Sequence, residues 1–251
     1  MSKPRIDRPT VPAHAMILAA GLGQRMRPLT DNKPKPMIEI SGKPMIDHQL
    51  DRLKEAGIGD CVVNLHYLAP VMERHLSARK APRVHFSHEE TLLETGGGVV
   101  KALKLLGAEP FLVLNGDQLW LDGPTPMLER LARHWNGKTM DALLLQHPIV
   151  AAHGYGGYGD YFMEPDGALK RRREEAVAPF VFAGVQILHP RLFKDCPASP
   201  FSLRLLYDRA QAAGRLFGMR HDGEWFHIGT PEILPLVEEY FGGTRRHRHG
   251  V

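Results

Sequence analysis

Short apolar runs alternate with helical patterns along the first half of the chain. The runs end at glycine or polar residues, and they occupy positions 13–20, 58–65, 84–87 and 111–114. Runs of this length and composition are typical of the buried strands of a parallel sheet. The segments with apolar residues at helical spacing lie at 44–56, just after Pro70 and at 98–106. The alternation predicts a Rossmann-like α/β fold, in which helices flank a mostly parallel open sheet.

The pattern changes near residue 140. Shorter runs separated by Gly, Pro and Asp follow, at 141–146, 158–164, 168–172 and 180–188. Two helical patterns come after them, at 201–213 and 231–241. We interpret the short runs as strands of a small mixed sheet that folds over a ligand and returns to the main sheet.

Composition is that of an ordinary globular protein. Of the 251 residues, 43% are hydrophobic and 24% charged, and the formal net charge is +4. The basic residues are spread along the chain, so they predict no nucleic-acid surface. The apolar run at 15–20 is too short to cross a bilayer, and the two cysteines form no zinc or disulfide motif. We therefore expect a cytoplasmic protein without a membrane or nucleic-acid partner.

The strongest chemical signal is the sequence LAAGLGQRMRPLTDNKPKP at 18–36. It joins a predicted strand to a glycine-bearing loop that contains Arg25, and two lysines follow in a proline-rich stretch. Glycines let backbone N–H groups approach an anion closely, and an arginine grips phosphate oxygens. The segment lacks the ending of a Walker loop and the third glycine of a dinucleotide fingerprint. It therefore predicts a phosphate site of another kind, with a strand-to-helix turn and surface arginines as the alternative.

Two further motifs lie where predicted strands end. The sequence EETLLETGGG at 89–98 places three glycines before an apolar helix, and such a loop can seat a flat ring against the backbone. Backbone N–H groups near Thr95 and Gly96 suit the carbonyls of a uracil, and Glu89 suits its N–H. Asp117, in the sequence NGD, follows a buried strand, where a carboxylate can hold Mg²⁺ against substrate phosphates. A capped helix start and a turn aspartate are the alternatives.

Together these motifs resemble the sugar-1-phosphate nucleotidyltransferases, in particular the N-acetylmuramate-1-phosphate uridylyltransferase type. The resemblance covers nearly the whole chain and includes LAAGLGQRMRPLT, KPKPM, LETGGG, NGD, FAGVQILHP and the late WFHIGTP. It implies a Rossmann-like sheet with a smaller sugar-binding part. It also implies transfer of a nucleotidyl group to a sugar 1-phosphate, with UTP and N-acetylmuramate 1-phosphate as the favoured substrates, in peptidoglycan recycling.

The resemblance also assigns roles to residues. Arg25 is expected to face the leaving pyrophosphate, Lys35 to bridge the reacting phosphates, and Asp117 to hold the metal. The residues expected to bind the nucleotide are Ala19, Ala20, Gly21, Gly23, Glu89, Thr95, Gly96 and Asn115. The expected metal is Mg²⁺, with Mn²⁺ as the alternative. The expected partners are small-molecule substrates, bound by a monomer or a small homo-oligomer.

The sequence patterns and the resemblance together divide the chain into parts. We expect a single domain at 13–242 between flexible ends. The parts are a flexible segment at 1–12, a nucleotide-binding part at 13–140, a sugar-binding part at 141–228, a closing helix at 229–242 and a flexible tail at 243–251.

One position departs from the family pattern. His227 stands where many relatives carry a second metal-binding aspartate. Mg²⁺ prefers oxygen ligands, so an imidazole is a poor direct replacement. We favour a metal-bound water that hydrogen-bonds to His227. Direct ligation of Mn²⁺ or another metal is one alternative, and a defective metal site in a catalytically silent nucleotide-sugar sensor is the other.

The sugar site is less marked in the sequence. The candidates are Gly159, Asp160 and Gly184, because small residues allow pyranose hydroxyls to approach closely, and turns between strands are the alternative for each. The basic run at 170–173 is a candidate for the sugar phosphate, although such runs more often form a solvated hairpin. The alternative substrates are another hexose or amino-sugar 1-phosphate, or phosphocholine, with a different nucleotide.

Overall fold

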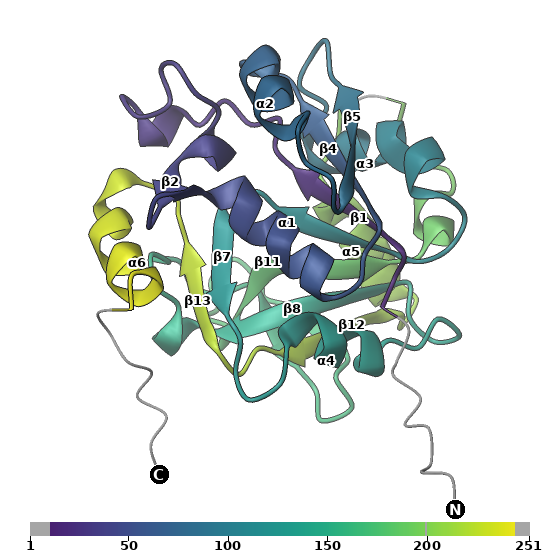
Figure 1. Cartoon of the computed structure of the whole chain (residues 1–251). Helices are drawn as coiled ribbons and strands as arrows, with labels where there is room; N and C mark the ends of the chain where they lie inside the picture. Colours follow the sequence, from purple (N-terminus) through teal and green to yellow (C-terminus); the bar gives the residue numbers. More distant parts are fainter. Residues whose placement is uncertain (1–10, 199, 244–251) are drawn as a thin grey trace, which may run out of the picture.

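A computed structural model describes residues 11–198 and 200–243 (Figure 1). Its centre is a nine-stranded sheet in the order β10-β9-β11-β6-β1-β4-β5, with β8 joined to β11 and β12 joined to β8. The strands are β1 His14–Leu18, β4 Asp60–Leu65, β5 Arg83–His88, β6 Phe111–Asn115, β8 Ala142–Pro148, β9 Tyr161–Met163, β10 Leu169–Arg171, β11 Phe180–Leu188 and β12 Leu216–Arg220. Most of the expected flexible ends, 1–12 and 243–251, lies outside the described residues.

Within the main sheet, the strands of the first half of the chain are parallel. β4 and β6 flank β1, with Ile17 opposite both Val63 and Leu114, and β5 continues the sheet beyond β4. β11 then pairs antiparallel with β6, so the second half of the chain extends the same sheet. β8 is antiparallel to β11, and β12 is parallel to β8. The predicted class, a Rossmann-like α/β sheet with a mixed addition, is confirmed.

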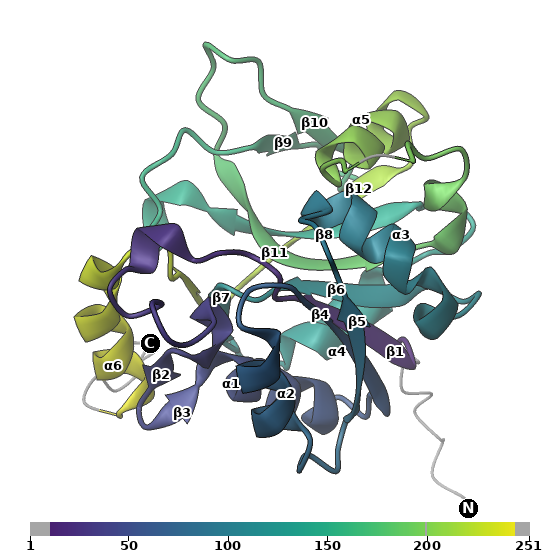
Figure 2. The same ribbon diagram turned by 90° about the horizontal axis from the view of Figure 1, so that it is seen from above.

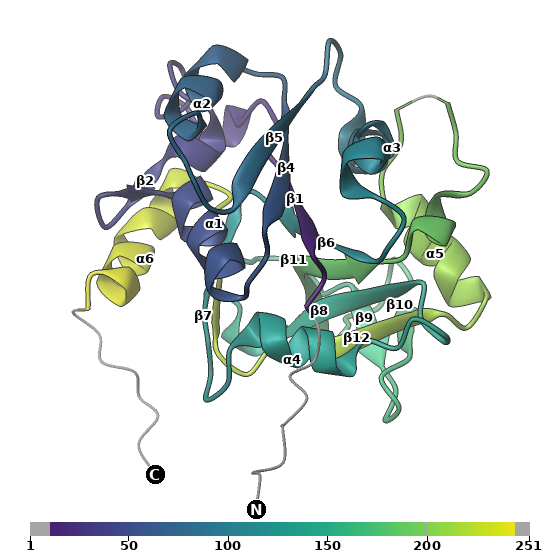
Figure 3. The same ribbon diagram turned by 45° about the vertical axis from the view of Figure 1, so that its right-hand side comes forward.

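Helices cover both faces of this sheet (Figure 3). The helices on one face are α1 Met45–Glu55, α2 Ala69–Leu76 and α4 Met127–His134, and those on the other are α3 Glu94–Leu106 and α5 Arg204–Ala212. Neighbouring residues of β1 show the division, because Ile17 belongs to the first apolar cluster and Met16 to the second. Successive side chains of a strand point to opposite faces. A strand covered on both faces is therefore apolar throughout, as the run at 13–20 predicts.

Two small sheets and α6 Leu234–Phe241 pack together beside the main sheet (Figure 1). The small sheets pair β2 Glu39–Ile40 with β3 Lys43–Pro44, and β7 Gln118–Leu121 with β13 Glu224–His227. A third apolar cluster joins them, and it includes Ile40, Leu119, Phe226 and Val237. The pairing of β7 with β13 matters for function, because its register places His227 opposite Gln118, the residue that follows Asp117.

Several elements are not predicted by the sequence pattern. They are α4, β2, β3, β7, β12, β13 and the 3-10 helices Gln24–Met26, Lys35–Met37, Ile149–Ala151 and Pro190–Phe193, whereas the 3-10 helix Pro231–Ile233 lies within the predicted helical segment 231–241. α3 also begins at Glu94 rather than at 98, so the three glycines lie inside the helix. Glycine is a poor helix former, which is why the pattern predicts a later start. Within the described part of the chain, no helix is both long and apolar enough to cross a membrane.

Candidate functional site

The loop after β1 forms one wall of a surface hollow of about 520 Å³, which we call the phosphate hollow. Its lining consists of residues 21–26, Lys35, Asp117 and Gly229. Gly23 has a φ of 63°, and Thr30 Oγ1 donates a hydrogen bond to its carbonyl. The N–H of the fully buried Met26 donates to the same carbonyl. The loop is thus anchored from inside, while Arg25 stays exposed on the hollow.

An ion pair lies in this hollow. Lys35 Nζ is 2.9 Å from Asp117 Oδ2, and the two side chains are only 12% and 30% exposed. Gly116 lies so close to β1 that an added Cβ would come within 2.6 Å of the Leu18 carbonyl oxygen. This approach fixes Asp117 beyond the carboxyl ends of adjacent parallel strands, where ligands bind in open α/β sheets. The structure thus joins two of the three expected catalytic residues and places the third, Arg25, on the same hollow.

His227 lies beside this ion pair. Its Nε2 is 3.8 Å from Asp117 Oδ2, which exceeds hydrogen-bond range. The N–H of the next residue, Ile228, donates to the Asp117 carbonyl and so ties the two segments together. Burial lowers the pKa of His227; Asp117 opposes this shift, and Lys35 and Arg25 add to it. The imidazole is therefore neutral near pH 7 and has a nitrogen lone pair for a hydrogen bond or a metal.

The Asp117 and His227 side chains can hold a divalent cation only if a bound phosphate supplies further ligands. Among the described residues, no group of three or more His, Cys, Asp or Glu side chains is arranged to hold a metal ion. Asp117 offers carboxylate oxygen and His227 a ring nitrogen. Mg²⁺ commonly takes one or two protein carboxylates and completes its shell with water and phosphate oxygens. The donor set therefore fits a metal that arrives with a nucleoside triphosphate.

A second hollow, of about 320 Å³, adjoins the first, and we call it the base hollow. It shares Gly21, Lys35 and Asp117 with the phosphate hollow and adds Ala19, Ala20, Asn64, Glu89, Thr95 and Asn115, among others. Glu89 is 5% exposed, and its carboxylate accepts hydrogen bonds from Asn64 Nδ2 at 2.7 Å and the Leu93 N–H at 3.1 Å. Asn64 Oδ1 in turn accepts one from the Ala19 N–H at 2.7 Å. Asn64 therefore links two predicted nucleotide-binding residues. In the sequence, Asn64 stands out only as a polar residue directly after the apolar positions 61–63.

The glycines of α3 serve close packing. The N–H groups of Gly96 and Gly97 both donate to the Phe201 carbonyl. A Cβ on Gly96 would come within 2.3 Å of the Phe201 ring, and one on Gly98 within 2.8 Å of Glu89 Oε1. The Gly96 N–H thus already has an acceptor, and the residue lies outside the base hollow. The neighbouring Thr95 does line the hollow.

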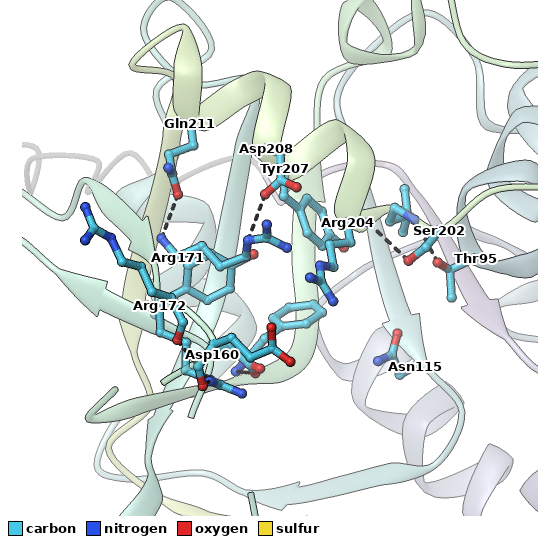
Figure 4. Close-up of a pocket in the computed structure, with 15 residues that line it drawn as sticks. Thr95, Asn115, Asp160, Arg171, Arg172, Ser202, Arg204, Tyr207, Asp208 and Gln211 are labelled. Atoms are coloured by element: carbon cyan, nitrogen blue, oxygen red, sulfur yellow. Dashed lines mark hydrogen bonds and ion pairs between the residues drawn. The ribbon is translucent and has the colours of Figure 1, made fainter. Parts of the chain in front are cut away.

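The strands β9, β10 and β11 and the helix α5 lie on one side of the molecule (Figure 2). A third hollow, of about 980 Å³, is lined by residues of these elements, and we call it the sugar cavity (Figure 4). Thr95 and Asn115 line both this cavity and the base hollow, so the three hollows adjoin in series. Asp160 lies on its wall, and Asp160 Oδ2 accepts a hydrogen bond from the Phe182 N–H at 2.8 Å. Burial raises the pKa of Asp160. The sequence pattern does not single out Arg204 and Tyr207, which line the cavity from α5.

The other two predicted sugar residues do not line this cavity. Gly159 has a φ of 73°, and a Cβ there would lie 2.1 Å from the Ala178 carbonyl oxygen. Gly184 has a φ of 71° within the irregular part of β11, and a Cβ there would lie 1.5 Å from Gln118 Oε1. Backbone conformation and close packing therefore require both glycines. Of the three predicted sugar residues, only Asp160 lies on the cavity wall.

Sequence comparison agrees with this geometry. The profile of the Nucleotidyl transferase family matches residues 14–159, which include the phosphate loop, Glu89 and Asp117. The chain belongs to this family. As a nucleotidyl transferase, it is an enzyme whose three adjoining hollows suit a nucleotide and a second substrate.

Two curated relatives of this nucleotidyl transferase are similar over nearly their whole length. The N-acetylmuramate alpha-1-phosphate uridylyltransferase of Caulobacter vibrioides is 42% identical over 232 residues, which are 90% of this chain and 96% of that protein. The protein of the same name from Neisseria meningitidis serogroup B is 35% identical over 220 residues, 86% of this chain and 93% of that protein. The UDP-glucose pyrophosphorylase from Acinetobacter baumanii shares the fold, with a TM-score of 0.78 and 18% identity over 93% of this chain and 94% of that chain.

Proposed function

We propose that this nucleotidyl transferase couples UTP to N-acetylmuramate 1-phosphate and produces UDP-N-acetylmuramate and pyrophosphate, in the recycling of cell-wall sugar. The observation that carries the proposal is the continuity of the three hollows. Lys35 and Asp117 line both the phosphate hollow and the base hollow, and Thr95 and Asn115 line both the base hollow and the sugar cavity. A nucleoside triphosphate and a sugar 1-phosphate can thus meet beside the Lys35–Asp117 pair. The Caulobacter and Neisseria relatives support the choice of substrates.

The reaction needs no general base. An oxygen of the sugar 1-phosphate attacks the α-phosphorus of UTP, a new P–O bond forms, and the bond from the α-phosphorus to the pyrophosphate oxygen breaks. A phosphate monoester has a second pKa of about 6, so the nucleophile is largely dianionic at neutral pH. The task of the protein is to bring two polyanions together in alignment. Lys35, where two hollows meet, and Arg25, in the phosphate hollow, supply positive charge for this.

The base and the sugar have separate acceptors in this scheme. Both Glu89 oxygens already accept one hydrogen bond each, from Asn64 and Leu93, and a carboxylate oxygen can accept a second. Glu89 is thereby held in place to accept the uracil N–H, while the backbone near Thr95 serves a uracil carbonyl. Asp160, on the wall of the sugar cavity, accepts hydrogen bonds from sugar hydroxyls.

A divalent cation, Mg²⁺ in preference to Mn²⁺, belongs to the same proposal. When bound, it neutralises phosphate charge without any proton transfer. Asp117 would hold it directly, because the carboxylate lines both hollows that receive the triphosphate. The neutral His227 would accept a hydrogen bond from one of its waters, since its Nε2 lies 3.8 Å from the Asp117 carboxylate.

Pyrophosphate release tests the proposed reaction. With UTP, Mg²⁺ and N-acetylmuramate 1-phosphate we expect turnover, and with CTP, GTP or dTTP we expect rates at least about tenfold lower, because a site that hydrogen-bonds one base leaves polar groups unpaired with another. Other sugar 1-phosphates and phosphocholine are run in parallel. Equal rates with another nucleotide would contradict the preference for UTP and leave the reaction class standing. No turnover with any pair, combined with tight UDP-sugar binding, would identify a silent sensor.

Replacement of His227 tests its relation to the metal. His227→Asp is expected to preserve turnover and to tighten metal binding, because it adds an anionic oxygen beside Asp117. His227→Ala should weaken the response to metal on the order of 10–100-fold, as the loss of a group that orients metal ligands commonly does, with little change in KM for the sugar. Rates titrated against Mg²⁺ and Mn²⁺ for wild type and both variants measure this.

The control for this experiment is His134→Ala, because His134 is exposed on α4 and lies outside the three hollows. We expect its metal response to equal that of wild type. Direct ligation by the imidazole predicts another pattern: a marked preference for Mn²⁺ or Co²⁺ over Mg²⁺ that disappears in His227→Asp. That pattern would mean that His227 ligates the metal directly rather than through a water.

A further inference from the structure

The turn that carries Asp117 is held by a side chain from α1. Gln49 Nε2 donates hydrogen bonds to two backbone carbonyl groups, those of Asn115 and Gln118, each at 2.8 Å. These two residues flank Gly116 and Asp117, where the chain passes from β6 to β7. An amide nitrogen carries two hydrogens, so this one group bridges the two ends of the turn.

Gln49 is the polar residue on the buried face of α1. It is 1% exposed, and the other buried residues of the helix are Met45, Ile46, Leu50 and Leu53. Its Oε1 has no hydrogen-bond partner among the described residues. A buried acceptor without a partner costs stability, and an apolar side chain of the same length would avoid that cost. The amide is therefore explained by its two donors rather than by packing.

Gln49 lies outside the proposed substrate site. It lines none of the three hollows, and it lies on the far side of the turn, where α1 packs against β7 (Figure 1). Asp117, in contrast, lines the phosphate hollow and the base hollow, and Asn115 lines the base hollow and the sugar cavity. An effect of Gln49 on the reaction must therefore pass through the turn.

Two other contacts hold the same turn, and both join backbone groups. The Gly116 N–H donates to the Leu18 carbonyl at 3.0 Å, and the Ile228 N–H donates to the Asp117 carbonyl at 2.9 Å. They tie the turn to β1 and to the segment after β13. Backbone groups are present whichever side chains stand at these positions, whereas the tie to α1 depends on the Gln49 amide. A substitution of Gln49 can therefore loosen the turn while these two contacts remain.

We propose that Gln49 is a positioning residue, which holds the Asp117 carboxylate at the place where the metal and the triphosphate meet. This inference rests on the proposed function, in which Asp117 holds the divalent cation. Without the bridge, the two ends of the turn can move apart, and the carboxylate is no longer fixed 2.9 Å from Lys35 Nζ. A charge stabilises a reaction best when it is held in position beforehand. Groups that orient a metal ligand commonly contribute about 10–100-fold to metal affinity or activity.

Calorimetric titration with UTP, in the presence of Mg²⁺ and with a chelator in its place, tests this role. Gln49→Met keeps an unbranched side chain of similar length and loses both donors. We expect its affinity for UTP with Mg²⁺ to fall on the order of tenfold, because the Asp117 carboxylate is less well placed. The affinity without Mg²⁺ should change little, because Arg25 and Lys35 remain. Turnover should fall on the order of 10–100-fold, with little change in KM for the sugar 1-phosphate.

A double variant tests whether Gln49 acts through Asp117. In Asp117→Ala the carboxylate is already absent, so the addition of Gln49→Met should cause little further loss of affinity or turnover. Residues that act through one another have effects that do not add. Losses that add in full would mean that Gln49 acts by another route, and would overturn the inference.

The control is Leu53→Ala, because Leu53 is fully buried on the same helix and lines none of the three hollows. It should lower the melting temperature at least as much as Gln49→Met does and leave the response of UTP affinity to Mg²⁺ unchanged. An equal loss of that response in Leu53→Ala would assign the effect to general destabilisation and overturn the inference. If Gln49→Met does not fold, Gln49→Asn, whose amide is one methylene shorter, takes its place with a smaller expected loss.

Failure of the inference and failure of the proposed function give different results. A wild type whose UTP affinity rises with Mg²⁺, together with a folded Gln49→Met that shows the same rise, would overturn the inference alone. A wild type whose UTP affinity ignores Mg²⁺ would overturn the metal role of Asp117 and this inference with it. A wild type that turns over no sugar 1-phosphate would refute the proposed function, and the calorimetry would still decide whether Gln49 positions Asp117.

Discussion

Asp117→Ala is expected to lower kcat by at least about 100-fold while the protein remains folded. Asp117 lines both the phosphate hollow and the base hollow, and its carboxylate pairs with Lys35 at 2.9 Å. The substitution removes the proposed metal ligand and also leaves the Lys35 ammonium without its partner. The positive charges that offset the phosphates are then no longer held in position. Pyrophosphate release at saturating UTP and metal measures the loss.

Asp31→Ala is the matched control for this substitution. Asp31 is also paired with a basic side chain, Arg27, at 3.5 Å, but both groups are 58% exposed and lie outside the hollows. We expect its kcat to be close to that of wild type, because exposed ion pairs contribute little. Melting curves of both variants show whether they fold. Normal turnover by folded Asp117→Ala would mean that the reaction takes place elsewhere on the protein.

Arg25→Ala is expected to lower kcat by about 100-fold as well. Arg25 is the exposed side chain on an anchored loop, in the hollow proposed to receive the departing pyrophosphate. Negative charge develops on that group as the bond to the α-phosphorus breaks, so the contact strengthens in the transition state and its loss appears in kcat more than in KM for UTP. The measurement is kcat and KM for UTP determined separately.

The control is Arg27→Ala, two residues along the same loop. Arg27 is exposed and pairs with Asp31, and it does not line the phosphate hollow. We expect wild-type kinetics from it. A loss in Arg27→Ala as large as that in Arg25→Ala would assign the effect to the charge of the loop as a whole. A rise in KM for UTP at unchanged kcat in Arg25→Ala would assign Arg25 to substrate binding alone.

Local rules in the sequence determined the fold class and the positions of the reactive loops. A strand covered on both faces must be apolar throughout, and a backbone that approaches phosphate closely needs glycine. The runs at 13–20 and 111–114 accordingly correspond to β1 and β6, and the loops after them carry Gly21 and Asp117. The carboxyl ends of parallel strands share one edge of the sheet. The strand assignment by itself therefore predicts that these loops lie close together.

Only the tertiary structure decided which polar groups were already paired. The Gly96 N–H is bound by Phe201, and Glu89 is held by Asn64. Asp208 is paired with Arg171. The strand that brings His227 to Asp117 likewise forms through a pairing of distant segments. The sequence shows which residues carry a donor or an acceptor, but it does not show whether that group is paired. Its partner is the group that long-range packing places beside it.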